Sequence, residues 1–292
     1  SRAFTAENKR QKKVEAECVR FLSMDNPDLC VVRYTVKPVN FSGTVDLAPY
    51  LNGDIRNEDA NYDEVFWDIT ATDSAQGTAY IEAVTKKTGF IAGFAMRYQI
   101  LVNGKPAGFD AKADNTDKYA ENSVSIDLKK GESVTIIKYV AVINSLYYKP
   151  ESIRSEAQTR ADQALKTGFE KLYKNHIQVW DTIWQQSDII IDGDTEAQQG
   201  IRFNIFQLNQ TYRGDDPRLN VGPKGFTGEK YGGSTYWDTE AFCIPFFLST
   251  APASVTRNLL VYRFNHLEKA VENAQKLGFK GGAALYPMVT MN

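Results

Sequence analysis

The spacing of apolar residues changes once along this 292-residue chain, near Pro150, and that change limits the folds open to it. Up to that point, short alternating runs rich in β-branched and aromatic residues are divided by turn signals such as Asn52-Gly53 and Lys130-Gly131. Beyond it, apolar residues recur every three or four positions, as they do on one face of a helix. The sequence therefore predicts a β-rich part followed by a helical part.

The chain before Pro150 has the pattern of an antiparallel β-sandwich. No helical pattern separates its expected strands, so each can pair with a neighbour through a turn. The polar interval 108–122 is interpreted as an exposed loop. Strands are expected within 4–22, 30–38, 44–51, 65–70, 79–85, 90–101, 123–128 and 133–144.

The chain after Pro150 has the pattern of successive helices. Residues 155–186 are expected to form one long amphipathic helix or two abutting ones, and 188–192 a short buried strand. Pro245 is expected to make its surroundings irregular, because proline has no N–H to donate. Further helical or apolar segments lie at 195–212, 240–249 and 250–277.

Composition indicates which kinds of partner the protein has and in which cellular compartment it is found. A net charge of −2 and a pI near 5.8 give no basic surface for nucleic acid or an anionic membrane, so neutral partners fit better. The three cysteines, Cys18, Cys30 and Cys243, lack metal-like or redox-like spacing, which favours a reducing compartment. With no signal core and no apolar run of about 18 residues, the protein is predicted to be cytoplasmic. Because it lacks an initiator Met, we expect the chain to be a piece of a longer polypeptide.

One stretch places an aromatic ring beside an acid where a loop enters an apolar segment. The glycine-rich loop 225–233 leads into Trp237 and Asp238. A flat ring can stack on the C–H face of a sugar while a carboxylate accepts hydrogen bonds from two adjacent hydroxyls. The pair is therefore a candidate for carbohydrate binding. Two plainer interpretations stay open from the residues alone, namely Asp238 as a helix N-cap and Trp237 as ordinary core.

The same stretch carries a resemblance to a known family. From Gly225 it reads G-x-T-G-E-x-Y-G-G-x-x-Y-W-D-T-E, with Pro245-Phe246 following, and this run resembles the glucoside phosphorylases of glycoside hydrolase family 65. Many members have His where this chain has Ser234, and the serine form is associated with members that act on maltose. The match in order and spacing is far more specific than a lone short motif.

The resemblance implies an α+β multidomain fold. Family members have an N-terminal β-sandwich, a helical linker and an (α/α)6-barrel catalytic domain. On this chain, 1–150 would be the N-terminal β-sandwich, incomplete at its start, 151–192 the helical linker, and 193–292 the first helices of a truncated barrel.

The resemblance also implies an activity. Family phosphorylases invert the anomeric centre, so the expected reaction is phosphorolysis of maltose, a glycosyl transfer to inorganic phosphate that gives glucose and β-glucose 1-phosphate without cofactor or metal. Trehalose, kojibiose and nigerose are alternative substrates, and a non-catalytic carbohydrate-binding module is an alternative of another class. Relatives are commonly dimers, so we expect a homodimer, with neither nucleic acid nor a membrane as partner.

The motif assigns binding residues but no catalytic ones. Trp237 and Asp238 match the pair that holds the non-reducing glucose where the bond is cleaved, whereas the general acid, a glutamate, and the phosphate site are expected beyond residue 292. Glu229 and Tyr231 are candidates for the pocket rim, with plain loop scaffolding as the alternative. Glu240 is interpreted as a capping or pairing group rather than an acid catalyst.

The histidines argue against two other kinds of site. His176 and His266 are the only two in the chain and fall in separate helical patterns. We therefore expect neither a histidine-based triad nor a metal cluster.

Overall fold

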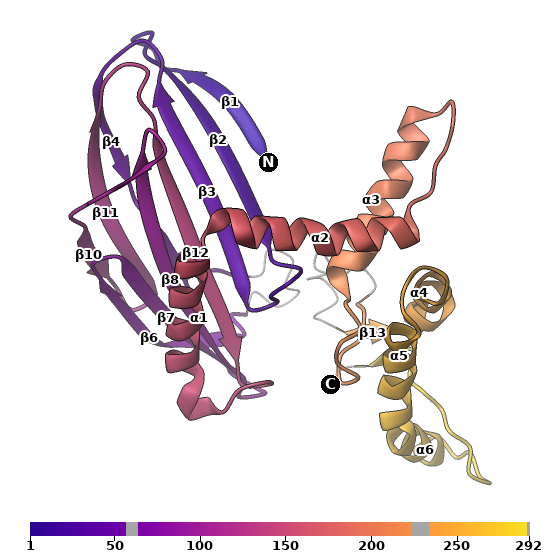
Figure 1. The fold of residues 1–292 in the computed structure, drawn as a ribbon. Helices are drawn as coiled ribbons and strands as arrows, with labels where there is room; N and C mark the ends of the chain where they lie inside the picture. Colours follow the sequence, from indigo (N-terminus) through magenta and orange to yellow (C-terminus); the bar gives the residue numbers. More distant parts are fainter. Residues whose placement is uncertain (57–63, 223–233, 291–292) are drawn as a thin grey trace. The chain divides into compact units, whose positions relative to one another are not determined.

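The computed structural model describes residues 1–56, 64–222 and 234–290, and the chain divides into two compact units. The first contains Ser1–Arg56 and Val65–Val179, and the second contains the chain from Trp180 onward. The division falls inside one helix (Figure 1). Each unit is described by itself below.

The first unit holds two antiparallel sheets. The larger has the order β1-β2-β3-β12-β8-β7-β6 with β9 paired to β8, and the smaller has β10-β11-β4 with β5 paired to β11. The predicted antiparallel sandwich is therefore confirmed. The strands are β1 (Arg2–Glu7), β2 (Lys13–Leu22), β3 (Leu29–Pro38), β4 (Gly43–Leu47), β5 (Tyr50–Asn52), β6 (Trp67–Ala75), β7 (Thr78–Thr85), β8 (Ile91–Val102), β9 (Lys105–Ala107), β10 (Lys112–Asn115), β11 (Tyr119–Leu128) and β12 (Val134–Asn144).

Strand β12 is buried on both faces, and it joins two parts of the core. Because successive side chains of a strand point to opposite faces, its alternate residues enter different clusters. Val134, Ile136 and Val140 pack with residues of the smaller sheet, such as Val124 and Leu128. The residues that pack on the opposite side, toward the helices, are Ile137, Tyr139, Ala141 and Ile143.

Two helices cover that opposite side, as Figure 1 shows for the first of them. After the short 3-10 turn Pro150–Ser152, α1 (Ile153–Thr167) packs on β8 and β12 through residues four apart, Ile153, Ala157 and Ala161, which are fully buried. Gly168, with φ 79°, ends α1, and α2 (Phe169–Ser187) begins at once. The sequence left open one helix or two over this region, and there are two.

Two segments of the first unit differ from expectation. Residues 4–22 contain two strands, because the Asn8 side chain accepts hydrogen bonds from the backbone N–H groups of Arg10 and Lys12 and so holds a tight turn. The interval 108–122 contains β10 and the start of β11, not only an exposed loop. Asn122 is fully buried there, where its amide bonds Tyr98 Oη, the Gly77 N–H and the Thr78 carbonyl. Asn122 is therefore polar because it bonds groups inside the sandwich, and the sequence pattern alone did not reveal this.

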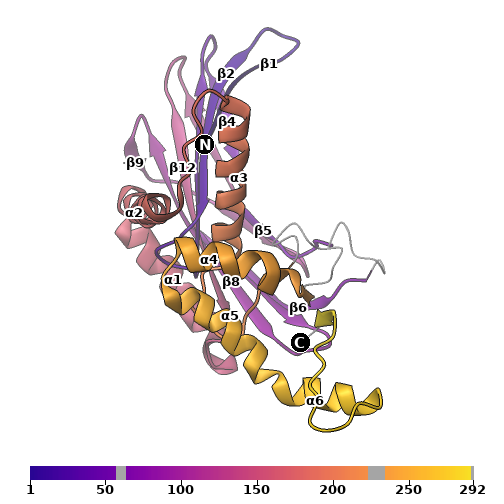
Figure 2. The same cartoon turned by 90° about the vertical axis from the view of Figure 1, so that its right-hand side faces the viewer.

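In the second unit, the described part of the chain is mainly helical. Trp180 of α2 stacks on Phe206 at a centroid distance of 5.2 Å, and α4 packs beside α5 (Figure 2). No helix in the described ranges is long and apolar enough to cross a membrane. The helical elements are α3 (Thr195–Thr211), η4 (Thr239–Cys243, a π-helical turn), α4 (Ile244–Thr250), α5 (Ala253–Asn265) and α6 (Leu267–Lys276).

Two expectations for the second unit were wrong. Residues 188–192 form no strand, and Ile190 is 76% exposed. The apolar run was too short to distinguish a buried strand from a connector. The helix expected over 250–277 is two, α5 and α6, which part at His266, where the backbone leaves the helical region.

Gly93 of β8 provides a test of how α1 docks on the sheet. A Cβ there would lie 2.6 Å from Ile153 Cγ2 and 2.9 Å from Tyr80 Oη, both in the fully packed cluster under α1. We expect Gly93→Ala to lower the free energy of unfolding by about 1 to 3 kcal/mol through overpacking. Gly108→Ala, whose Cβ would meet nothing within 4 Å, is the control. Equal denaturation midpoints for the two variants would contradict this packing.

Candidate functional site

Trp237 and Asp238 lie at the junction of a short strand pair and a π-helical turn. The strand β13 (Thr235–Tyr236) pairs antiparallel with β14 (Val289–Thr290), and η4 begins directly after Asp238. Two segments more than fifty residues apart in sequence thus meet just before the candidate residues.

The π-helical turn brings Trp237 beside Phe242. Ile244 donates its N–H to the Thr239 carbonyl, five residues back, and Pro245, which has no N–H, follows in the first turn of α4. The predicted irregularity around Pro245 is therefore confirmed. In this wider turn the rings of Trp237 and Phe242 lie 6.2 Å apart, and both side chains are exposed, at 55% and 66%. Within the described residues, Trp237 is not core.

Asp238 occupies the N-cap position of η4 without acting as a side-chain cap. Its backbone is helical, with φ −55° and ψ −32°, and its side chain accepts no capping hydrogen bond. An effective N-cap has extended backbone angles, which aim the side chain at the N–H groups of the first turn. The half-buried carboxylate therefore keeps its acceptor oxygens for other groups.

Glu240 is a structural pairing group, as predicted. Arg263 Nε donates to its Oε1 at 2.6 Å and Arg263 Nη2 to its Oε2 at 3.0 Å. Arg263 also donates to the Tyr236 carbonyl and to Thr290 Oγ1, each at 3.0 Å. The sequence analysis did not single out Arg263. The one local signal was a charged residue within the otherwise apolar pattern of 259–264.

Two further motif side chains face inward. Thr239 is 2% exposed and donates from Oγ1 to the Val221 carbonyl at 3.0 Å, so it holds the start of η4 to the preceding segment. Ser234 is 3% exposed. Its association with maltose consequently rests on the family resemblance and not on a surface position beside Trp237.

Glu229 and Tyr231, the candidates for the pocket rim, lie outside the described residues. Their roles stay predictions. Trp237 and Asp238 are the two predicted site residues that the structure describes.

The pKa of the Cys243 thiol depends on the carboxylates near it. Burial raises the pKa of its thiol, and the nearby carboxylates of Asp238 and Glu240 raise that pKa further. Cys243 packs against Phe247 and its neighbours, which agrees with its interpretation as a small hydrophobic residue.

The histidines are engaged in structure. His176 accepts from the Met24 N–H at 3.2 Å and packs against the Phe21 ring at a tilted angle, and burial lowers the pKa of its imidazole. His266 Nδ1 lies 2.7 Å from the Tyr262 carbonyl. In the part of the chain that the structure describes, no group of three or more metal-ligating side chains gathers.

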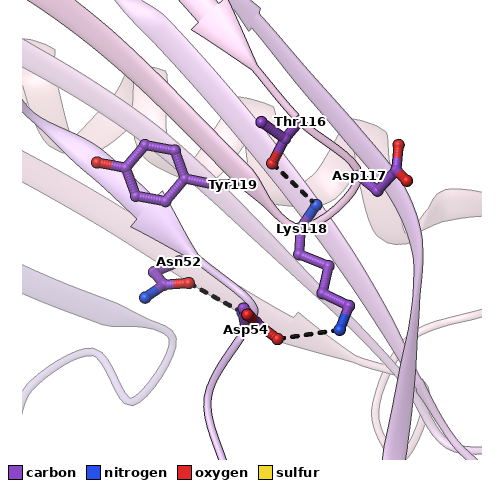
Figure 3. A pocket seen from close by; sticks show the side chains of 6 residues that line it. All are labelled: Asn52, Asp54, Thr116, Asp117, Lys118 and Tyr119. Atoms are coloured by element: carbon purple, nitrogen blue, oxygen red, sulfur yellow. Dashed lines mark hydrogen bonds and ion pairs between the residues drawn. The ribbon is translucent and has the colours of Figure 1, made fainter.

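An open polar pocket of about 550 Å³ lies in the first unit, at the turn before β11 (Figure 3). Lys118 Nζ bonds Asp54 Oδ1 at 2.9 Å, and the Asn52 amide oxygen accepts from the Asp54 N–H. These contacts neutralise the lysine and join the turn after β5 to the turn before β11. The pocket offers nothing comparable to the exposed indole and uncapped carboxylate of the second unit.

Comparison with known proteins assigns the class. Residues 1–183 match the glycosyl hydrolase family 65 N-terminal domain, and residues 202–292 match the central catalytic domain of the same family. The chain belongs to glycosyl hydrolase family 65, as its motif indicated.

Particular relatives include enzymes for different disaccharides. The chain is 41% identical over 281 residues to maltose phosphorylase of Bacillus subtilis (strain 168) and 30% identical over 289 residues to α,α-trehalose phosphorylase of Thermoanaerobacter brockii. Each match covers 96% of this chain and 36% of the relative. A solved structure of a human-microbiome protein, provisionally described as a kojibiose phosphorylase, has TM-score 0.85 at 27% identity, with 99% of this chain and 36% of that one covered. The chain thus spans little more than a third of the length of these relatives.

The placement of Asp238 can be tested through Cys243. We expect Asp238→Asn to lower the pKa of the Cys243 thiol, because a negative charge that disfavours the thiolate is removed. Iodoacetamide should then alkylate Cys243 faster at pH 8, as measured by mass spectrometry of its peptide. Cys30, whose pKa is raised by burial and lowered by Lys138, is the internal control and should react unchanged. An unaltered rate at Cys243 would contradict the proximity.

Proposed function

We propose that the protein containing this chain phosphorolyses maltose to glucose and β-glucose 1-phosphate. The observation that carries the proposal is the exposed Trp237 beside the uncapped Asp238, within a motif of the disaccharide phosphorylase family. The 41% identity to a maltose phosphorylase supports maltose as substrate. We further propose that 193–292 form the first helices of an (α/α)6 barrel, with 1–150 as the sandwich and 151–192 as the linker.

In this proposal, Trp237 and Asp238 hold the non-reducing glucose. The indole stacks on the C–H face of the ring, and the carboxylate accepts hydrogen bonds from two neighbouring hydroxyls. Such bonds raise the rate to the extent that they are stronger in the transition state than in the ground state. The two residues are thus binding and orienting groups, and neither transfers a proton.

The bond-breaking groups lie elsewhere in the proposed scheme. A glutamic acid beyond residue 292 protonates the glycosidic oxygen, while inorganic phosphate attacks the anomeric carbon from the opposite face and inverts it. Phosphate already carries negative charge, so it needs no base of the kind that activates water in an inverting hydrolase. The scheme requires neither cofactor nor metal, and the homodimer expected from relatives remains a prediction that light scattering can check.

Substrate choice is the finer part of the proposal. The similarity to a trehalose phosphorylase and to the structure described as a kojibiose phosphorylase supports a second candidate, phosphorolysis of another glucosyl disaccharide. We expect the intact protein to release β-glucose 1-phosphate from maltose and phosphate, and not from trehalose, kojibiose or nigerose. Product from one of the other three disaccharides alone would move the assignment to it. No product from any of them would favour a non-catalytic carbohydrate-binding module.

Asp238→Ala separates a binding role from a structural one. The loss of a hydrogen bond to a charged group costs about 1.5 to 3 kcal/mol, so kcat/KM for maltose should fall by about 10- to 150-fold or more. The unfolding temperature should stay close to that of the wild type, because the side chain makes no capping bond. Retained activity per folded molecule together with a large loss of stability would instead make Asp238 a structural residue.

A further inference from the structure

We propose that Arg263 is the positioning residue of the candidate site. It lies in the last turn of α5, and its guanidinium contacts three separate segments around the Trp237–Asp238 turn. This inference rests on the proposed function, because it assigns Arg263 the task of holding the sugar-binding pair in its working geometry. Nothing in the motif itself includes this residue, which follows Asp238 by 25 positions.

The contacts of Arg263 bracket the pair on both sides along the chain. Nη2 holds the carbonyl of Tyr236, the residue before Trp237, and Nε with Nη2 holds the carboxylate of Glu240, two residues after Asp238. The three residues between these anchors, Trp237 to Thr239, cannot move as a unit without breaking a charge-assisted bond at one end. The rigid guanidinium plane fixes both anchors relative to α5.

A third contact extends the brace to the paired strand. Arg263 Nη1 donates to Thr290 Oγ1 at 3.0 Å, and Thr290 is opposite Thr235 in the β13–β14 pair. The Tyr286 hydroxyl in turn donates to the Arg263 carbonyl at 2.9 Å. Both strands that lead to the site are thereby fastened to one residue.

The same contacts argue against Arg263 as an anion-binding group. Its side chain is 14% exposed, its hydrogen bonds engage all three of its nitrogens, and Glu240 neutralises its charge. These four bonds leave one of the five guanidinium N–H donors, so a phosphate could form a two-point contact only by displacing a protein acceptor. We therefore expect Arg263 to affect the rate of the chemical step and not the affinity for phosphate.

The test compares two arginines with similar ion pairs in the second unit of the intact protein. Arg263→Met removes every hydrogen-bond donor of the side chain but keeps an apolar stem. Arg263→Lys keeps the positive charge but loses the planar, two-point donor geometry of the guanidinium. Arg202→Met is the matched control, because Arg202 makes a two-point ion pair with Asp188, at 2.8 Å and 2.6 Å, away from the motif. Hydrogen exchange is read at the backbone amides of 235–241, and kcat and KM are measured for maltose and phosphate.

We expect Arg263→Met to speed exchange across 235–241 and to lower kcat by about 100-fold, because displacement of about 1 Å at a reacting centre has an effect of this size. KM for phosphate should change less than about threefold, because Arg263 does not bind phosphate and its loss leaves binding in the ground state unaltered. Arg263→Lys should recover part of kcat, and Arg202→Met should match the wild type in exchange and in kcat. If Arg263→Met does not fold, Thr290→Val, which removes one acceptor, should show smaller changes of the same kind.

Several outcomes would overturn the inference. Unchanged exchange at 235–241 would show that Arg263 does not hold the turn. Equal losses of stability in Arg263→Met and Arg202→Met with unaltered kcat per folded molecule would reduce it to a structural residue, and a rise confined to KM for phosphate would make it an anion-binding group. If the wild type acts on none of the disaccharides, the proposed function fails, whereas the exchange data still decide whether Arg263 positions the turn.

Discussion

A charge that is largely removed from water governs the geometry of the candidate site. The Arg263 side chain is 14% exposed, so its guanidinium needs an anion and several acceptors close by. Glu240, the Tyr236 carbonyl and Thr290 supply them. The requirement is mutual, since a strand, a π-helical turn and a helix must converge for the charge to be satisfied. Between these fixed points, Trp237 stays 55% exposed and the Asp238 side chain makes no capping bond, which suits a binding site held by its surroundings.

In the sandwich, too, the packing depends on one central element. The central strand β12 gives alternate side chains to the two faces of its sheet, so that the smaller sheet packs on one side and α1 with the start of α2 on the other. The approach of α1 depends on small residues, Ala157 and Ala161 on the helix and Gly93 beneath it. In the first unit, therefore, the position of α1 follows from the face of β8 and β12 that the smaller sheet leaves uncovered.

The class of fold and the local geometry of the candidate motif could be predicted from sequence because both depend on local signals. Alternation predicted the strands, the three- and four-residue period predicted the helices, and Pro245 predicted an irregular turn, which is a π-helical one. The motif placed the aromatic and acidic side chains beside each other, and the two family models agree with it. Even the two-helix outcome over 155–186 was among the stated alternatives.

The sequence could not predict contacts between residues that lie far apart along the chain. The buried role of Asn122 needs partners more than twenty residues away, so its polarity suggested a loop. The apolar run 188–192 predicted a strand, yet no strand pairs with it among the described residues. Arg263 was missed for the same reason, because its acceptors at Tyr236, Glu240 and Thr290 are separated from it by 23 to 27 residues. The periodicity of a helix predicts which of its faces is apolar, but it does not predict which distant residues a single arginine on that helix will bond.

The most direct test of the account is a crystal structure of the intact protein with glucose bound. The account predicts the glucosyl ring stacked on the Trp237 indole, with two adjacent hydroxyls donating to the Asp238 carboxylate at about 2.6 to 3.0 Å. It also predicts that the bonds of Arg263 to Tyr236 and Glu240 are retained in that complex. Glucose bound elsewhere, with Trp237 and Asp238 enclosed by packing from other parts of the protein, would contradict it.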